Sequence, residues 1–71
     1  MDKRRFSLRA ARIQAGLGRA EVAERLGVNG GTIWRWERGK MSPPADMAER
    51  LCRMYGFKFE DIDWDKKGGK A

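Results

Sequence analysis

The side chains best able to do chemistry gather in one stretch, Asn29 to Lys40, which reads NGGTIWRWERGK. Here Arg35, Arg38 and Lys40 stand close to an aromatic residue, Trp34. Arginine and lysine carry positive charge and donate hydrogen bonds, and the guanidinium fork matches the O6 and N7 acceptors of guanine. The chemistry offered by this stretch is therefore recognition of anions and base edges.

Groups for catalysis or metal binding are scarce. The chain has one cysteine and no histidine, so an internal disulfide is impossible, a Cys/His zinc site lacks ligands and histidine acid–base chemistry is absent. We expect no enzyme activity, metal, cofactor or small-molecule substrate. Cys52 lies in an apolar helical stripe and is interpreted as a buried structural thiol.

The first of two helical patterns that position this stretch begins at Arg19. Val22, Ala23 and Leu26 recur at spacings of three and four, which predicts one apolar side of a helix. Gly27 follows, and glycine adopts the left-handed conformation that ends a helix. A small residue and a glycine at these places favour a steep corner between two helices.

The second pattern predicts a helix from about Gly30 to Arg38, with Asn29 as its N-cap. Ile33 and Trp36 face the core. The opposite face has no apolar periodicity and consists of Gly30, Gly31, Trp34, Arg35 and Arg38. Asn-Gly is also a hairpin signal, but the helical periodicity on both sides favours the corner. A helical corner without a DNA role remains an alternative.

The length and the charge of the chain restrict the classes of protein to which it can belong. Seventy-one residues make one small domain, and 41% hydrophobic content is too high for intrinsic disorder. The net charge of +6 arises entirely in residues 1–53, whereas residues 54–71 are neutral overall. A basic face of this kind is typical of nucleic-acid binding, although a solvated surface would look similar. No apolar run reaches membrane-spanning length, so we expect a cytoplasmic protein and no membrane partner.

The chain divides into a basic arm (1–6), a helical domain (7–64) and a flexible polar tail (65–71). Ser7 is the expected N-cap of a first helix that runs to about Ala15, and Pro44 begins a fourth that Gly56 ends. Their inward positions are Leu8, Ala11 and Ala15 in the first, and Ala45, Ala48, Leu51, Cys52 and Tyr55 in the fourth. A last apolar cluster of Phe57, Phe59 and Ile62 predicts a short fifth helix.

The central stretch resembles the phage-repressor, Cro-like (XRE-type) helix-turn-helix family. The matching residues are Ala23, Gly27, the apolar set Val22, Leu26, Val28, Ile33 and Trp36, and the ending Glu37-Arg38-Gly39. The resemblance extends from about Leu8 to Ile62. It implies an all-α, compact five-helix, lambda-repressor-like DNA-binding domain whose helix-turn-helix is formed by helices 2 and 3. It also implies an ion pair between Arg12 and Glu37, two residues that could otherwise be unrelated surface charges.

The resemblance implies sequence-specific binding of double-stranded DNA by a small transcriptional regulator. We expect a repressor that occupies its operator with the third helix in the major groove, as a homodimer on a palindromic site. The alternatives are an antitoxin that represses its own operon and binds a protein partner, and a protein-interaction adaptor with the same fold. Salt-sensitive DNA binding would argue against the adaptor.

Roles follow for the residues of the reading surface. Arg19, Asn29, Arg38 and Lys40 are expected at phosphates, Arg35 at guanine, and Thr32 and Trp34 at thymine methyls or sugars. The family often carries base-reading side chains where this chain has Gly30 and Gly31, which instead allow close approach of the backbone. Trp34 is expected to be exposed. Its alternative is to fold over the two glycines.

Overall fold

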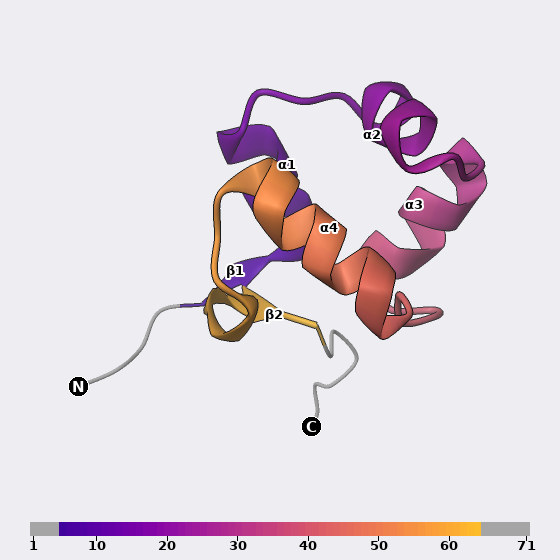
Figure 1. Ribbon diagram of the computed structural model, residues 1–71. Helices are drawn as coiled ribbons and strands as arrows, with labels where there is room; N and C mark the ends of the chain where they lie inside the picture. The colour runs from indigo at the N-terminus through magenta and orange to yellow at the C-terminus, as the bar shows by residue number, and fades with distance from the viewer. Residues whose placement is uncertain (1–4, 65–71) are drawn as a thin grey trace.

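The computed structural model describes residues 5–64, which form four α-helices and a short parallel strand pair (Figure 1). The elements are β1 (Phe6–Ser7), α1 (Leu8–Gln14), α2 (Arg19–Leu26), α3 (Gly30–Glu37), α4 (Ala45–Tyr55), the 3-10 helix η1 (Phe59–Asp61) and β2 (Ile62–Asp63). The strand pair lies at the end of the molecule away from α2. The predicted arm and tail lie outside the described residues, except for Arg5 and Phe6.

The prediction of an all-α, five-helix domain is correct for the four α-helices and wrong near the two ends of the described chain. The expected fifth helix is a single 3-10 turn, and Phe6 pairs with Ile62 in a parallel strand contact that was not predicted. Two-residue strands are too short to show an alternating pattern in the sequence. Phe59, a member of the predicted last apolar cluster, is 59% exposed and stacks on Trp64, with ring centroids 5.0 Å apart.

Local hydrogen bonds fix the corner between α2 and α3. Gly27 has φ +73°, and the N–H of Val28 donates to the carbonyl oxygen of Ala23 at 3.0 Å, which closes a Schellman motif. The Asn29 Oδ1 atom then accepts from the N–H of Gly31 at 3.1 Å. Hydrogen bonds therefore stabilise both the predicted end of α2 and the predicted start of α3.

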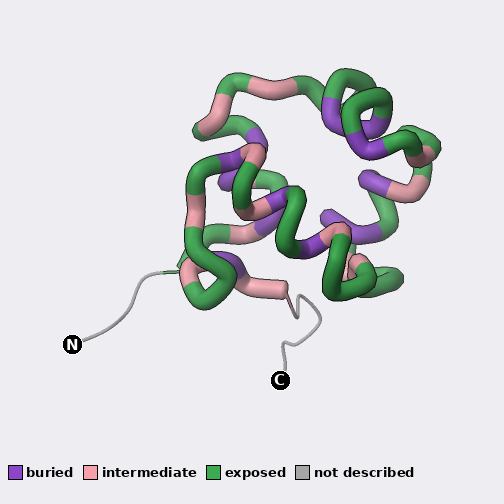
Figure 2. The backbone as a smooth tube through the Cα atoms, viewed as in Figure 1, coloured by how far each residue is buried: buried purple, intermediate pink, exposed green. Residues whose placement is uncertain are grey.

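The core is built from residues of all four α-helices and of β2, and buried positions are purple in Figure 2. Its buried apolar residues are Leu8, Ala11, Val22, Ala23, Leu26, Ile33, Trp36, Ala48, Leu51, Tyr55 and Ile62. Four predicted inward positions are less buried: Ala15, Val28 and Cys52 are half-buried, and Ala45 is exposed. These positions lie at helix ends, in the turn or at the edge of a stripe, where neighbouring elements cover only one side. Among the described residues, no helix is long and apolar enough to cross a membrane.

Candidate nucleic-acid interface

The outer face of α3 is free because its inner face anchors the helix. Ile33 and Trp36 are 1% and 4% exposed and belong to the core cluster to which α1, α2 and α4 also contribute. Gly30, Gly31 and Arg35 are exposed on the other side, as the sequence predicted. The α2–α3 corner therefore presents an accessible helix on a rigid support, which is the arrangement that a groove-reading helix needs.

A hollow of about 760 Å³ lies beside this face. We call it the cationic hollow; its walls are Ser7, Arg9, Arg19, Trp34, Glu37, Arg38 and Lys40. Four of these side chains are cations, and they come from α1, the first residue of α2, the end of α3 and the loop that follows. Residues far apart in sequence thus contribute positive charge to one concave surface that suits phosphate oxygens.

The carboxylate in the wall of the hollow is held by a buried ion pair. Arg12 Nε donates to Glu37 Oε2 at 2.7 Å, and Arg12 Nη2 donates to Glu37 Oε1 at 3.2 Å. The hydrogen bond to Glu37 is the largest cause of a raised pKa of Arg12. The expected pair is therefore present, and the alternative of two unrelated surface charges is wrong. Because Arg12 compensates the charge of Glu37, this carboxylate lowers the positive potential of the hollow less than an unpaired carboxylate would.

Arg12 also fixes the loop between α1 and α2. Its Nη1 atom donates to the carbonyl oxygen of Leu17 at 3.0 Å. One guanidinium thus joins α1, the loop before α2 and the end of α3. These three segments carry, or directly precede, the cations Arg9, Arg19 and Arg38 of the hollow. The ion pair is consequently a structural support for the hollow.

Tyr55 on α4 has an unusual hydroxyl group. The residue is 5% exposed, and its hydroxyl oxygen has no hydrogen-bond partner in the described part of the chain. Burial raises the pKa of the phenol, the negative charge of Glu37 raises it further, and Arg12 partly offsets both. The phenol remains neutral at physiological pH and contributes packing rather than charge.

Trp34 and Arg38 form a stacked pair at the edge of the hollow. The Arg38 Cζ atom lies 4.9 Å from the centroid of the Trp34 ring, a cation–π geometry, and Trp34 is 39% exposed. Exposure of Trp34 is as predicted. Its alternative, folding over the two glycines, is wrong: a Cβ at Gly31 would have only Asn29 Oδ1 (3.5 Å) and Arg35 Nη1 (3.7 Å) within 4 Å, and a Cβ at Gly30 would have no atom that close.

The structure sorts the predicted DNA-binding residues into two groups. One group lines the cationic hollow and consists of Arg19, Trp34, Arg38 and Lys40. The other lies at the start of α3 or one turn further along, outside the walls of the hollow, and consists of Asn29, Gly30, Gly31, Thr32 and Arg35. Asn29 Oδ1 is engaged in capping α3, and Thr32 is half-buried. The candidate interface therefore has a helical reading face and a cationic wall.

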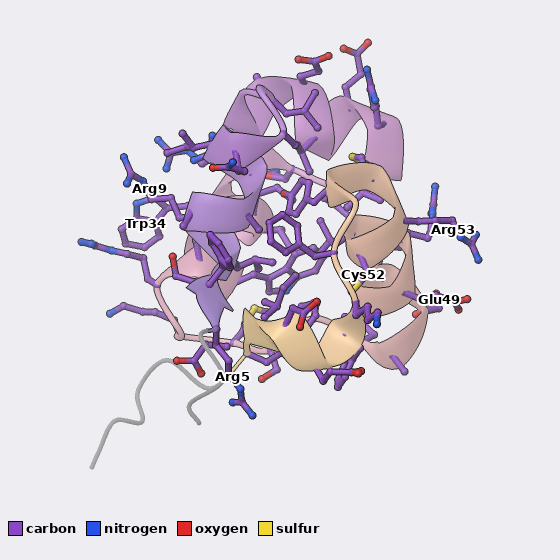
Figure 3. All side chains as sticks on the ribbon, turned by 90° about the vertical axis from the view of Figure 1, so that its left-hand side faces the viewer. Arg5, Arg9, Trp34, Glu49, Cys52 and Arg53 are labelled. Carbon is purple, nitrogen blue, oxygen red and sulfur yellow. The ribbon has the colours of Figure 1, made fainter. Side chains whose placement is uncertain are left out.

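Arg9 was not among the predicted site residues, yet it lines the hollow. Figure 3 shows Arg9 and Trp34 on one side of the molecule and Cys52 and Arg53 on the opposite side. The signal in the sequence was weak: Arg9 follows the inward Leu8 and so points outward from the first helix. Only the packing of α1 against the rest of the domain places it in the wall of the same hollow as Arg38.

Comparison with known proteins now identifies the fold. Residues 6–64 match the family described as "Helix-turn-helix domain". The chain belongs to this family. Within this helix-turn-helix protein, α2 and α3 are the two helices joined by the Gly27 turn. No solved structure matches the chain significantly.

Several curated relatives share this helix-turn-helix domain. The chain is 47% identical over 55 residues to a protein of Pyrobaculum aerophilum named "Putative HTH-type transcriptional regulatory protein PAE1627", covering 78% of this chain and 21% of that protein. It is 41% identical over 59 residues to an uncharacterized HTH-type transcriptional regulator of Methanothermobacter thermautotrophicus, covering 82% and 86%. It is 30% identical over 60 residues to the cryptic phage CTXphi transcriptional repressor RstR of Vibrio cholerae, covering 84% and 54%. The chain thus spans about a fifth of the first relative and about half of the last.

Other chemistry finds little support at this surface. In the part of the chain that the structure describes, no group of three or more Cys, Asp or Glu side chains could hold a metal ion. Burial is the first cause of a raised pKa of the Cys52 thiol, followed by the charges of Asp61 and Glu49, so this thiol is a poor nucleophile. What the described side chains offer at the hollow is a set of cations, an aromatic ring and one compensated acid.

Proposed function

We propose that this protein binds double-stranded DNA sequence-specifically and regulates transcription, as a repressor that occupies its operator. The observation that carries the proposal is the convergence of Arg19, Arg38 and Lys40 beside the exposed face of α3. The names of the relatives support it, since several are HTH-type transcriptional regulators and one is a phage repressor.

In this proposal the first turns of α3 enter the major groove. Arg35 is exposed and carries the fork that pairs with guanine O6 and N7. Gly30 has open space where a Cβ would stand, so the backbone can approach the DNA closely there. Thr32 offers a methyl group to thymine, and Asn29 holds the helix start while lying close to the backbone of the DNA.

The wall of the hollow positions this reading helix. Arg19 begins α2, whose N-cap is Gly18 and has no side-chain hydrogen bond, so the first N–H groups of the helix are open to a phosphate. Arg38 and Lys40 reach phosphates at the other end of α3. Because phosphate contacts carry no sequence information, specificity in this arrangement depends on Arg35, on the α3 backbone and on DNA shape.

We further propose that the protein acts as a homodimer on a palindromic operator. A single α3 has eight residues and reaches only a few base pairs. Two copies that read two half-sites, one helical turn of DNA apart, multiply the specificity.

Selection of bound duplexes from random DNA tests the proposal. We expect an enriched motif with inverted symmetry and an affinity that falls steeply with salt. Arg35→Ala should relax the preference at one base pair, at a cost of about 1–3 kcal/mol. Lys40→Ala should weaken binding to all sequences alike and reduce the salt slope by about one. Absence of salt-sensitive binding would contradict the proposal and favour a protein-interaction adaptor.

A further inference from the structure

We infer that α1 is part of the DNA interface and that Arg9 contacts the phosphate backbone. The inference rests on the proposed function and extends it, because the cationic hollow then holds a backbone segment between α1 and the end of α3. Neither the sequence comparison nor the helix-turn-helix corner assigns a role to Arg9. Its place in the wall of the hollow indicates a role in binding phosphate.

The position of Arg9 is fixed by the helix that carries it. Leu8 and Ala11 on α1 are 2% and 0% exposed, so this helix is anchored in the core and the Arg9 side chain is left on its outer side. The Oγ atom of Ser7 caps the helix by accepting from the N–H of Ala10 at 3.0 Å. Arg9 therefore projects from a rigid support, on the side of the molecule that also carries Trp34 (Figure 3), and it lines the hollow.

The charge around Arg9 favours an anion. Arg9, Arg19, Arg38 and Lys40 line one hollow, where their like charges repel each other. A phosphate bound among them removes this repulsion and accepts charge-assisted hydrogen bonds from several donors at once. The carboxylate nearby, Glu37, cannot take this role for all of them because it is engaged with Arg12.

Other exposed arginines of the protein have a different environment. Arg25 and Arg53 each pair with a glutamate one helical turn earlier, at 3.0 Å, and lie outside the hollow. Arg53 is on the side of the molecule opposite Arg9 and Trp34 (Figure 3). Arg53 therefore serves as a matched control: an exposed helical arginine whose loss changes the net charge by the same amount.

The test compares Arg9→Ala, Arg9→Lys and Arg53→Ala with the wild-type protein on its selected operator and on a random duplex, by fluorescence anisotropy at several salt concentrations. We expect Arg9→Ala to weaken binding to both duplexes by the same several-fold factor. It should also reduce the slope of log K against log salt by about 0.9, the value for one phosphate contact. Arg9→Lys should restore the slope, and Arg53→Ala should change neither quantity.

Three outcomes would overturn the inference. If Arg9→Ala behaves like Arg53→Ala while the wild type still binds DNA with strong salt dependence, α1 is outside the interface and the proposed function stands. If Arg9→Ala changes the ratio of operator to random affinity, Arg9 reads a base instead of holding a phosphate. If the wild type lacks salt-sensitive DNA binding, both the proposed function and this inference fail. Circular dichroism of each variant ensures that the comparison is between folded proteins.

Discussion

The guanidinium group of Arg38 lies over the indole ring of Trp34, with Cζ 4.9 Å from the ring centroid. The two residues are four apart, so they meet on one side of the helix end. A cation–π contact at an exposed site contributes about 0.5–1 kcal/mol. The tryptophan thus holds one cation of the hollow in place, which gives an exposed aromatic ring a role even without direct contact with a base.

We expect Trp34→Ala to lower operator affinity while the free energy of unfolding falls by no more than about 1 kcal/mol, because the ring lies outside the core and its cation–π contact is exposed. Trp34→Phe keeps an aromatic face and should retain part of the affinity. Urea denaturation and DNA titration of the same preparations measure the two quantities separately.

The matched control for Trp34 is Phe59, another exposed aromatic residue that lies outside the hollow. Phe59→Ala should leave operator affinity unchanged. A Trp34→Ala variant that loses stability but binds the operator normally would show that the ring only packs on the domain.

A second prediction concerns the buried pair of Arg12 and Glu37. Removing one partner leaves the other buried and uncompensated, which costs about 3–5 kcal/mol. The single variants Arg12→Ala and Glu37→Ala should therefore be far less stable than the wild type. In a double-mutant cycle, followed by thermal and urea unfolding, we expect a coupling energy of about 0.5–3 kcal/mol.

Arg25 and Glu21 provide the comparison for this cycle. They form an exposed pair at 3.0 Å, with about half of each side chain accessible. An exposed pair of this kind contributes about 0.3–0.5 kcal/mol, so its cycle should give a much smaller coupling. Equal couplings for the two pairs would mean that burial of Arg12 and Glu37 adds nothing.

A third prediction compares two glycines: Gly27, whose backbone has a positive φ, and Gly31, which lies in a helix. Gly31→Ala introduces a Cβ 3.5 Å from Asn29 Oδ1 and 3.7 Å from Arg35 Nη1, which are ordinary contacts. Alanine at this helical position should therefore raise the free energy of unfolding by about 0.5–1 kcal/mol. Gly27→Ala should lower it by about 1–2 kcal/mol, because φ is +73°.

DNA binding by the Gly31 variant tests the role of the bare backbone at the start of α3. If the backbone approaches the DNA there, Gly31→Ala should bind the operator less tightly than the wild type although it is more stable. Unchanged operator affinity in the stabilised variant would show that no close approach occurs at this residue.

A fourth prediction concerns alkaline pH and Tyr55. Its folded-state pKa is raised above the ordinary value of 10.0, first by burial. The folded protein therefore keeps the phenol neutral at a pH at which the unfolded chain has begun to ionise. The stability that the neutral phenol contributes is fully present below about pH 10 and is lost as the pH rises beyond it. Tyr55→Phe should unfold with a smaller loss of stability above pH 10.

The same variant should be at least as stable as the wild type at pH 7, because the buried hydroxyl has no hydrogen-bond partner among the described residues. Urea unfolding of both proteins between pH 7 and 11 checks the two expectations. A clear loss of stability at pH 7 in Tyr55→Phe would show that the hydroxyl makes a stabilising interaction.

The sequence by itself determined the corner of the domain, because local interactions form it. The conformational freedom of Gly27, the capping oxygen of Asn29 and the spacing of Ile33 and Trp36 act within a few residues. Each is therefore visible as a residue type at a fixed distance along the chain. The pair of Arg12 and Glu37 is different: it could be expected only through resemblance to a family, since 25 positions separate its members.

Only the tertiary structure decided which charges meet. Arg9 and Lys40 line the same hollow because α1 and α3 pack on a shared core, and nothing in the local sequence around Arg9 encodes that distance. The pairing of Phe6 with Ile62 is likewise a contact between the two ends of the domain. Side chains distant in sequence are brought together by burial of apolar surface across the whole chain, so their convergence depends on how the helices cross and not on any single motif.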